Sequence, residues 1–188
     1  MPKYELNSVE HKKHGGFTLL ELLVTITILS ALSVLAVPSF NSFVANQRIK
    51  SVSYDLISTL VSARSEAIKR NAGVIVTPIT TGGVTNWQNG WTVATAAAPT
   101  VPLIQRPALT GMTVVCKADA SSATITTSAC PAITFNAFGR LSAGSTSPAI
   151  QVTGANGGYR RCIGIDLSGR PESTKGSASG SASTWVCP

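Results

Sequence analysis

Apolar residues fill the chain from residue 17 to residue 37, and Glu21 is the one charged side chain among them. A helix over this run is about 30 Å long at ~1.5 Å per residue, which matches the hydrocarbon core of a bilayer. We therefore expect a membrane-spanning helix over 17–37. A carboxylate in such a run costs roughly 2.5–3.5 kcal/mol, which marks Glu21 as a candidate functional residue.

The pattern changes after Pro38, where apolar residues recur every three or four positions, as on one face of an amphipathic helix. Charged residues lie mostly off this face, and Glu66 and Arg70 have the i,i+4 spacing of an ion pair. Residues 71–73, Asn-Ala-Gly, supply a stop signal, so we expect one helix from about Phe17 to Arg70. The apolar stripe consists of Ile49, Val52, Leu56, Leu60, Val61, Ala67 and Ile68.

Beyond residue 73, short segments rich in β-branched residues alternate with glycine-containing turns, a pattern typical of antiparallel sheet. The Ala-, Thr-, Ser- and Pro-rich segments 95–102 and 142–148 are predicted to be loops. The expected fold class is α+β, with a long N-terminal helix packed on an antiparallel β-sheet head. The predicted strands are 74–78, 91–94, 112–116, 123–127, 133–135, 150–152 and 162–167.

Sixteen residues precede the apolar run, and they include three lysines and both histidines of the chain. A secretory signal carries its small-residue cleavage site after the apolar region, whereas here the pair Gly15-Gly16 comes before it. Cleavage after Gly16 would remove this leader and create a new ammonium on Phe17. An uncleaved signal anchor is the alternative. By the positive-inside rule the basic leader stays cytoplasmic and residues 38–188 become extracytoplasmic.

The segment Gly16-Phe17-Thr18-Leu19-Leu20-Glu21-Leu22 resembles the class III signal of type IV pilins and type II secretion pseudopilins. The resemblance implies that a prepilin peptidase cuts between Gly16 and Phe17 and methylates the Phe17 amine. It divides the chain into a leader (1–16), the transmembrane and filament-core half of the helix (17–37) and an extracytoplasmic head (38–188). In a filament, Glu21 would face the Phe17 ammonium of a neighbouring subunit, which offsets the desolvation of both charges and favours one register. Pro38 lies where pilins carry a helix-bending proline.

Three head segments resemble, in the same order, the GspH/FimT family of low-abundance pilins: 87–91 (Trp-Gln-Asn-Gly-Trp), 133–141 and 161–171. The resemblance implies a minor type IV pilin that is inserted in the inner membrane with its head in the periplasm and is then incorporated into a pilus. The alternative is a GspH-like pseudopilin of a type II protein secretion system, whose N-terminal signal is the same. The aromatic residues of these segments, Trp87, Trp91, Phe135 and Phe138, are expected to be core residues.

Four cysteines, Cys116, Cys130, Cys162 and Cys187, all lie in the exported part. An oxidising compartment favours two disulfides. Three pairings are possible, and we favour Cys116–Cys130 with Cys162–Cys187. No cysteines have CxxC spacing and no histidine follows residue 16, so we expect no metal site.

Enzymatic activity and a bound cofactor are also not expected. Without histidine, the mature chain has no His-assisted nucleophile, and it has no glycine-rich phosphate loop followed by lysine. The carboxylates of the head are scattered along the sequence, at Asp55, Glu66, Asp119, Asp166 and Glu172.

The chain carries a formal charge of +7, and four of its cations, Arg160, Arg161, Arg170 and Lys175, lie within the last 30 residues. Such a cluster suggests double-stranded DNA as a further partner, for natural transformation, with Lys117, Arg106 and Arg140 as possible additions. FimT-type pilins implicated in DNA uptake carry a Gly-Arg-x-Arg motif followed by a mobile tail. Here Gly169-Arg170 begins that motif, but Glu172 replaces the second arginine. Lys175 and a flexible stretch 173–183 would compensate in part; the alternative is that these cations only confer solubility.

Overall fold

The computed structural model describes residues 16–117, 124–142, 148–154, 159–176 and 187, with the side chains of 34–38 left aside. The chain forms two compact units, residues 1–42 and 43–188. The described part of the first unit is helical from residue 19 onward, and the second contains the rest of this helix and the β head.

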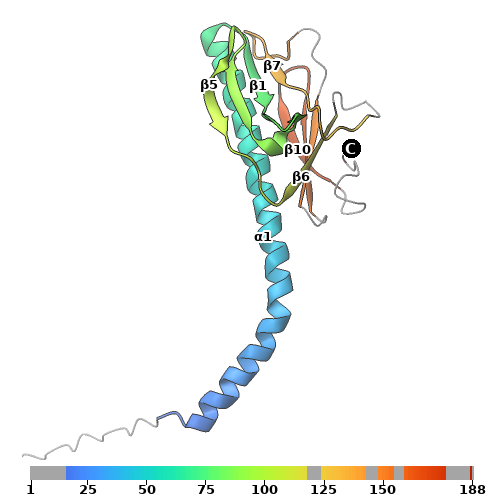
Figure 1. Cartoon of the computed structure of the whole chain (residues 1–188). Helices are drawn as coiled ribbons and strands as arrows, with labels where there is room; N and C mark the ends of the chain where they lie inside the picture. Colours follow the sequence, from blue (N-terminus) through green and yellow to red (C-terminus); the bar gives the residue numbers. More distant parts are fainter. Residues whose placement is uncertain (1–15, 118–123, 143–147, 155–158, 177–186, 188) are drawn as a thin grey trace, which may run out of the picture. The chain divides into compact units, whose positions relative to one another are not determined.

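The predicted helix is present as α1, which covers Leu19–Arg70 (Figure 1). Its C-terminal end has the two hydrogen bonds of a Schellman motif: Asn71 N donates to Ile68 O at 3.1 Å and Ala72 N donates to Ala67 O at 3.1 Å. Asn71 supplies the left-handed residue of this motif, with φ of 50°. The predicted stop is confirmed, and asparagine rather than glycine makes it.

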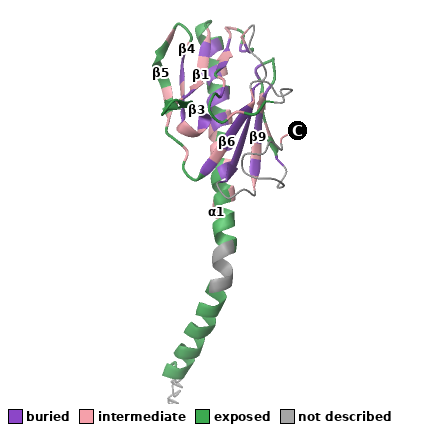
Figure 2. Cartoon of the chain, turned by 45° about the vertical axis from the view of Figure 1, so that its right-hand side comes forward, coloured by how far each residue is buried: buried purple, intermediate pink, exposed green. Residues whose placement is uncertain are grey.

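The head half of α1 buries one face at regular intervals (Figure 2). Val61 and Ile68, which the sequence pattern assigned to this face, are 46% and 52% exposed, so that assignment is wrong for both. The small residues Ser53 and Ala63 are buried on this face instead, at 2% and 0% exposure. The buried positions are Ile49, Ser53, Leu56, Thr59, Leu60, Ala63 and Ala67, the 3–4 spacing of a helix stripe.

Two four-stranded sheets form the head, and every pairing in them is antiparallel. A short two-stranded ribbon and a 3₁₀ turn, η1 (Trp87–Asn89), connect β1 to β4. This confirms the α+β class. The first sheet has the order β5 (Ala98–Arg106), β4 (Trp91–Thr95), β1 (Val74–Pro78) and β7 (Ile133–Phe135); the second has β10 (Pro171–Lys175), β9 (Arg160–Ile165), β8 (Ala149–Gly154) and β6 (Met112–Lys117); the ribbon is β2 (Thr80–Thr81) with β3 (Val84–Thr85).

Most strand predictions are confirmed, and β1 and β7 have the predicted bounds. The loop predicted over 95–102 is wrong, because β5 begins at Ala98 and pairs with β4. The strand predicted over 123–127 is also wrong in its described part, where Thr126 forms only an isolated bridge with Cys116. Strand β10 was not predicted, and residues 143–147 and 177–186 lie outside the described residues.

Helix α1 and both sheets share one core, in which Trp87 and Trp91 are each 1% exposed. The two indoles lie with their ring centroids 6.3 Å apart at an interplanar angle of 54°. Asn86 joins this region to the second sheet, since its Nδ2 donates to Val114 O at 3.1 Å. Gly90 has φ of 91°, and a Cβ there would clash with the Arg106 carbonyl oxygen. The segment 87–91 is therefore a packing centre, as expected for its tryptophans.

Candidate functional site

The predicted processing junction lies directly before the start of α1. Thr18 caps the helix: its Oγ1 accepts a hydrogen bond from Glu21 N at 3.2 Å, and its carbonyl accepts one from Leu22 N at 3.2 Å. A side chain at Gly16 would meet nothing in the described part of this chain, and Phe17 is 86% exposed. The described part of the chain therefore gives no reason for glycine at position 16.

Glu21 occupies the third position of the helix, where a carboxylate complements the positive end of the helix dipole. Thr18-Leu19-Leu20-Glu21 has the spacing of a capping box, so the helix start was itself predictable from these four residues. No ion pair to Glu21 exists within the described residues. Its predicted partner, the ammonium of a processed Phe17 on another subunit, stays a prediction.

The hydroxyl groups of residues 19–33 in α1 form hydrogen bonds inside the helix. Thr25 and Thr27 donate to the carbonyls of Leu22 and Val24, each at 2.8 Å. Ser30 and Ser33 make equivalent bonds at 2.8 Å. These bonds use the hydroxyl hydrogens within the helix, so the outer surface of residues 19–33 is close to purely apolar apart from Glu21.

The sequence predicts a membrane-spanning segment over 17–37. Within the part of the chain that the structure describes, no helix is sufficiently long and apolar to cross a membrane.

The four proposed DNA-contacting residues do not form one surface. Arg160 is 0% exposed, so the prediction that it contacts DNA is wrong. Arg160 lies on the same face of β9 as the buried Cys162, whereas Arg161 lies on the other face, with the core residues Ile163 and Ile165. Arg161 is half-buried and Lys175 is exposed. These two are directly opposite each other in the register of β9 and β10.

Arg161 and Lys175 meet at a side chain that the sequence did not single out, Tyr159. The Arg161 Cζ lies 5.7 Å from the centroid of the Tyr159 ring, and the Lys175 Nζ lies 6.0 Å from it. Lys50 of α1 brings a third cation to the same ring, with its Nζ 5.7 Å from the centroid. We call Lys50, Tyr159, Arg161 and Lys175 the Tyr159 cluster. Sequence spacing could not reveal it, because Lys50 is more than 100 residues from the other members.

Arg170 lies at the opposite end of the β9–β10 hairpin. It forms an ion pair with Glu172, Nη2 to Oε1 at 3.8 Å, with both side chains largely exposed. The departure from the Gly-Arg-x-Arg pattern thus places a carboxylate against the arginine that was expected to contact phosphate. Such an exposed pair contributes little to stability, but it reduces the positive charge available at Arg170.

The three possible additional cations belong to separate elements. Arg106 Nη2 is 2.9 Å from Asp55 Oδ1, an ion pair that ties β5 to α1. Arg140 is exposed in the turn after β7, and Lys117 is half-buried at the end of β6. The prediction from the sequence therefore placed too many cations of the head on one surface.

Two of the family-like segments end in tight turns of similar design. In the turn 136–140, Asn136 Oδ1 accepts from Phe138 N at 3.0 Å and from Arg140 N at 3.1 Å. Gly139 N donates to Asn136 O at 2.9 Å. The Phe138 side chain at this turn is 80% exposed, so its assignment to the core is wrong, whereas Phe135 is fully buried as expected. Phe138 follows the strand instead of belonging to it, which turns its ring outward.

The second turn, 166–170, repeats these bonds. Asp166 Oδ1 accepts from Ser168 Oγ at 2.6 Å and from Arg170 N at 2.9 Å. The Ser168 hydroxyl, followed by the Arg170 backbone N–H, stabilises the carboxylate and holds the pKa of Asp166 below its ordinary value. A Cβ at Gly169 would clash with the Gly139 carbonyl oxygen, so the two turns pack directly on each other. The segments 133–141 and 161–171 therefore each contribute one turn to a direct contact between turns.

Both predicted disulfides are present, Cys116–Cys130 and Cys162–Cys187. Each has its Cα atoms 5.7 Å apart, an ordinary separation. Among the described residues, no group of three or more His, Cys, Asp or Glu side chains is arranged to hold a metal ion.

A family model described as type II transport protein GspH matches residues 54–169, more than half of the chain. A second model, the prokaryotic N-terminal methylation motif, matches residues 11–37. No curated protein matches the sequence significantly.

Two crystal structures of the type IV minor pilin FimU from Pseudomonas aeruginosa resemble the chain. One has 20% sequence identity and a TM-score of 0.53, covering 74% of this chain and 96% of FimU. The other has 21% identity and a TM-score of 0.52, covering 70% and 95%. The shared feature is the pilin fold, a long helix followed by antiparallel sheets.

Proposed function

Because the chain belongs to the GspH/FimT family of type IV pilin-like proteins and carries a prokaryotic N-terminal methylation motif, we propose that it is a minor type IV pilin. A prepilin peptidase removes residues 1–16, and Phe17 is N-methylated. The mature chain then joins other pilin subunits in a pilus and contributes to its assembly. Its role is structural rather than enzymatic.

The observation that carries this proposal is the exposed first half of α1. Leu19, Leu20 and Ile26 are 83%, 71% and 55% exposed. Burying apolar surface stabilises by ~25 cal/mol per Å², so a whole helix of such residues favours an apolar environment. A bundle of equivalent helices in a filament core provides one, and the inner membrane provides another before assembly.

Glu21 fits the same arrangement. Processing would create an ammonium on Phe17, four positions before Glu21. In a filament the carboxylate of one subunit and the ammonium of the next compensate each other in an otherwise apolar core. This pairing would select one axial register among helices whose remaining surface is nearly uniform.

The proposal is tested by Gly16→Ala, with Gly15→Ala as the matched control. We expect intact-mass spectrometry to show full-length, unmethylated Gly16→Ala protein, and a cleaved and methylated product for Gly15→Ala and the wild type. Because a side chain at position 16 meets nothing in the described chain, the head should melt at the same temperature in all three. Normal processing of Gly16→Ala, or absence of the wild-type chain from sheared pili, would contradict the proposal.

The alternative is a pseudopilin of a type II secretion system, and the description of the matching family as a type II transport protein favours it. The two functions differ in their filament. Deletion of a minor pilin should reduce surface pili, whereas deletion of a pseudopilin should leave exoproteins in the periplasm with pili unchanged.

DNA binding is a second function that we propose for the head, with natural transformation as its output. The observation that favours it is the meeting of Arg161 and Lys175 at one end of the second sheet, where opposed cations attract phosphate. Arg160 has no part in it, and Arg170, paired with Glu172, is a weak candidate.

A further inference from the structure

The Tyr159 cluster gathers several positive charges at one place on the head. Lys175 and Arg161 are directly opposed across two strands, an arrangement that is destabilising for like charges. Lys50 adds a third cation from α1. The group that these cations share is a neutral ring, whose attraction for a cation is roughly 0.5–1 kcal/mol at exposed sites.

Three carboxylates of the described residues form ion pairs. Their ion pairs join Glu66, Asp55 and Glu172 to arginines and a lysine outside the cluster, and none includes Lys50, Arg161 or Lys175. The pair Arg170–Glu172 lies at the far end of β10. At that end the turn with Gly169 packs on the turn with Gly139, and Gly139 lies against Ile68 of α1. Ile68 is ~18 residues after Lys50, which is about 27 Å along the helix.

We infer that the Tyr159 cluster is a binding site for the phosphate backbone of duplex DNA, with Lys50, Arg161 and Lys175 contacting phosphates and Tyr159 holding the three cations together. This rests on the proposed DNA-binding function and moves its site away from the Gly-Arg-x-Arg position. Lys50 becomes a binding residue, although it belongs to the long helix rather than to the C-terminal segment.

Tyr159 acts here as a positioning residue and not as a stacking platform. Its ring is partly buried against the core, and three cations approach it within 6.0 Å. A nucleobase would have to displace them in order to stack. The site should therefore contact phosphates without regard to base sequence.

The test is fluorescence anisotropy of a labelled 30-base-pair duplex with the full mature chain in detergent, at a series of salt concentrations. The site variant is Lys50→Gln/Arg161→Gln/Lys175→Gln. The matched control is Lys69→Gln/Arg140→Gln/Arg170→Gln, which removes the same charge from exposed positions elsewhere. We expect the site variant to lose about 10-fold or more in affinity and its log–log salt slope to fall by about 2.7, while the control changes less than about 3-fold.

Variants at position 159 test the positioning role. Tyr159→Phe keeps the aromatic face and should bind as the wild type does, whereas Tyr159→Leu keeps apolar volume but not the ring quadrupole, and should bind several-fold more weakly. Unchanged thermal melting of each variant excludes misfolding as the cause.

The outcomes separate the inference from the function on which it rests. Equal losses in the site and control variants would overturn the site but leave DNA binding. No binding by the wild type at low salt would overturn both. Binding to phosphatidylglycerol vesicles without binding to the duplex would assign the cluster to a membrane surface and refute the proposal.

Discussion

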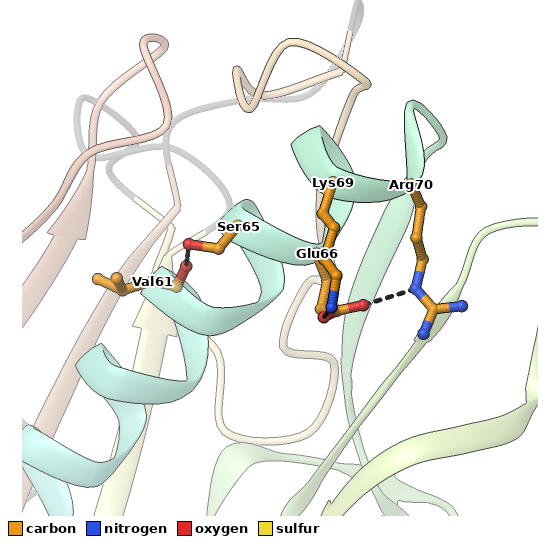
Figure 3. A network of polar contacts seen from close by, with 5 residues as sticks. All are labelled: Val61, Ser65, Glu66, Lys69 and Arg70. Carbon is orange, nitrogen blue, oxygen red and sulfur yellow. Dashed lines mark hydrogen bonds and ion pairs between the residues drawn. The ribbon is translucent and has the colours of Figure 1, made fainter.

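The two halves of α1 differ in the burial of their apolar side chains and in the ion pairs of their acids. From Phe17 to Leu32 the large apolar residues are exposed, whereas Ile49, Leu56 and Leu60 are at most 1% exposed. The acids differ in the same way. Glu66 has two cationic partners in its own chain, Arg70 at 2.6 Å and Lys69 at 3.7 Å (Figure 3), while Glu21 has none among the described residues.

This difference shows which interactions the chain completes alone. The sheets of the head cover the apolar face of the head half, and neighbouring cations pair with its acid. This half is therefore part of a folded domain. The first half has a cap, satisfied hydroxyls and correct helix geometry, but its apolar surface and its acid still need partners. Under the proposed function that half serves assembly, and substitutions in the two halves should therefore have separable effects.

The largest effect is expected for Glu21→Ala. The variant should be cleaved and methylated normally but be nearly absent from sheared pili, because the neighbouring Phe17 ammonium would be buried without a counter-charge. Immunoblotting of the pilus fraction against the membrane fraction measures this. Wild-type incorporation would show that Glu21 serves only the helix start of its own chain.

The same substitution in each half, Leu60→Ala or Leu20→Ala, compares how much the two halves contribute to the stability of the head. Leu60 is 0% exposed and Leu20 is 71% exposed. Urea unfolding of the head should show a loss of ~2–5 kcal/mol for Leu60→Ala, the usual cost of removing a buried leucine, and no measurable change for Leu20→Ala. A head destabilised by Leu20→Ala would mean that the two halves are energetically coupled.

The smallest effect concerns Glu66. The Arg70 side chain donates to its carboxylate and holds the pKa of Glu66 below its ordinary value, with Lys69 adding to the effect. A lowered folded-state pKa contributes stability above the unfolded pKa, near 4.5, and this contribution is lost as the pH falls through the folded value. Glu66→Gln should therefore lower the urea midpoint slightly at pH 7 and not at all at pH well below 4.5. A difference that persists or grows in acid would contradict the ion-pair origin.

Much of the fold could be predicted from periodicity. The 3–4 spacing of apolar residues indicated the head half of α1, and β-branched segments between glycines indicated most strands. Strand β5 was missed because Pro99 and Pro102 suggest a loop. Proline is tolerated there because β5 is the edge of its sheet and bulges between Val93 and Thr95 of its partner β4.

The site residues were harder to predict, because burial and long-range contacts decide their roles. Arg160 and Arg161 are adjacent cations in sequence, but they lie on opposite faces of β9, where the first is buried and the second is half-buried. Phe138 was predicted to be a core aromatic, but it lies in the turn that Asn136 stabilises and its side chain is exposed. Tyr159 and Lys50 become neighbours only through the packing of α1 beside the second sheet. The junction 16–21 was accessible to sequence reasoning because its signal is local.

The disulfide Cys162–Cys187 closes a loop with a sequence separation of 25 and starts at a cysteine of β9. The edge strand β10 lies inside the closed loop, so it cannot be peeled from its sheet as a free end. The cross-link therefore holds this edge strand in place by a covalent bond, in addition to its pairing with β9.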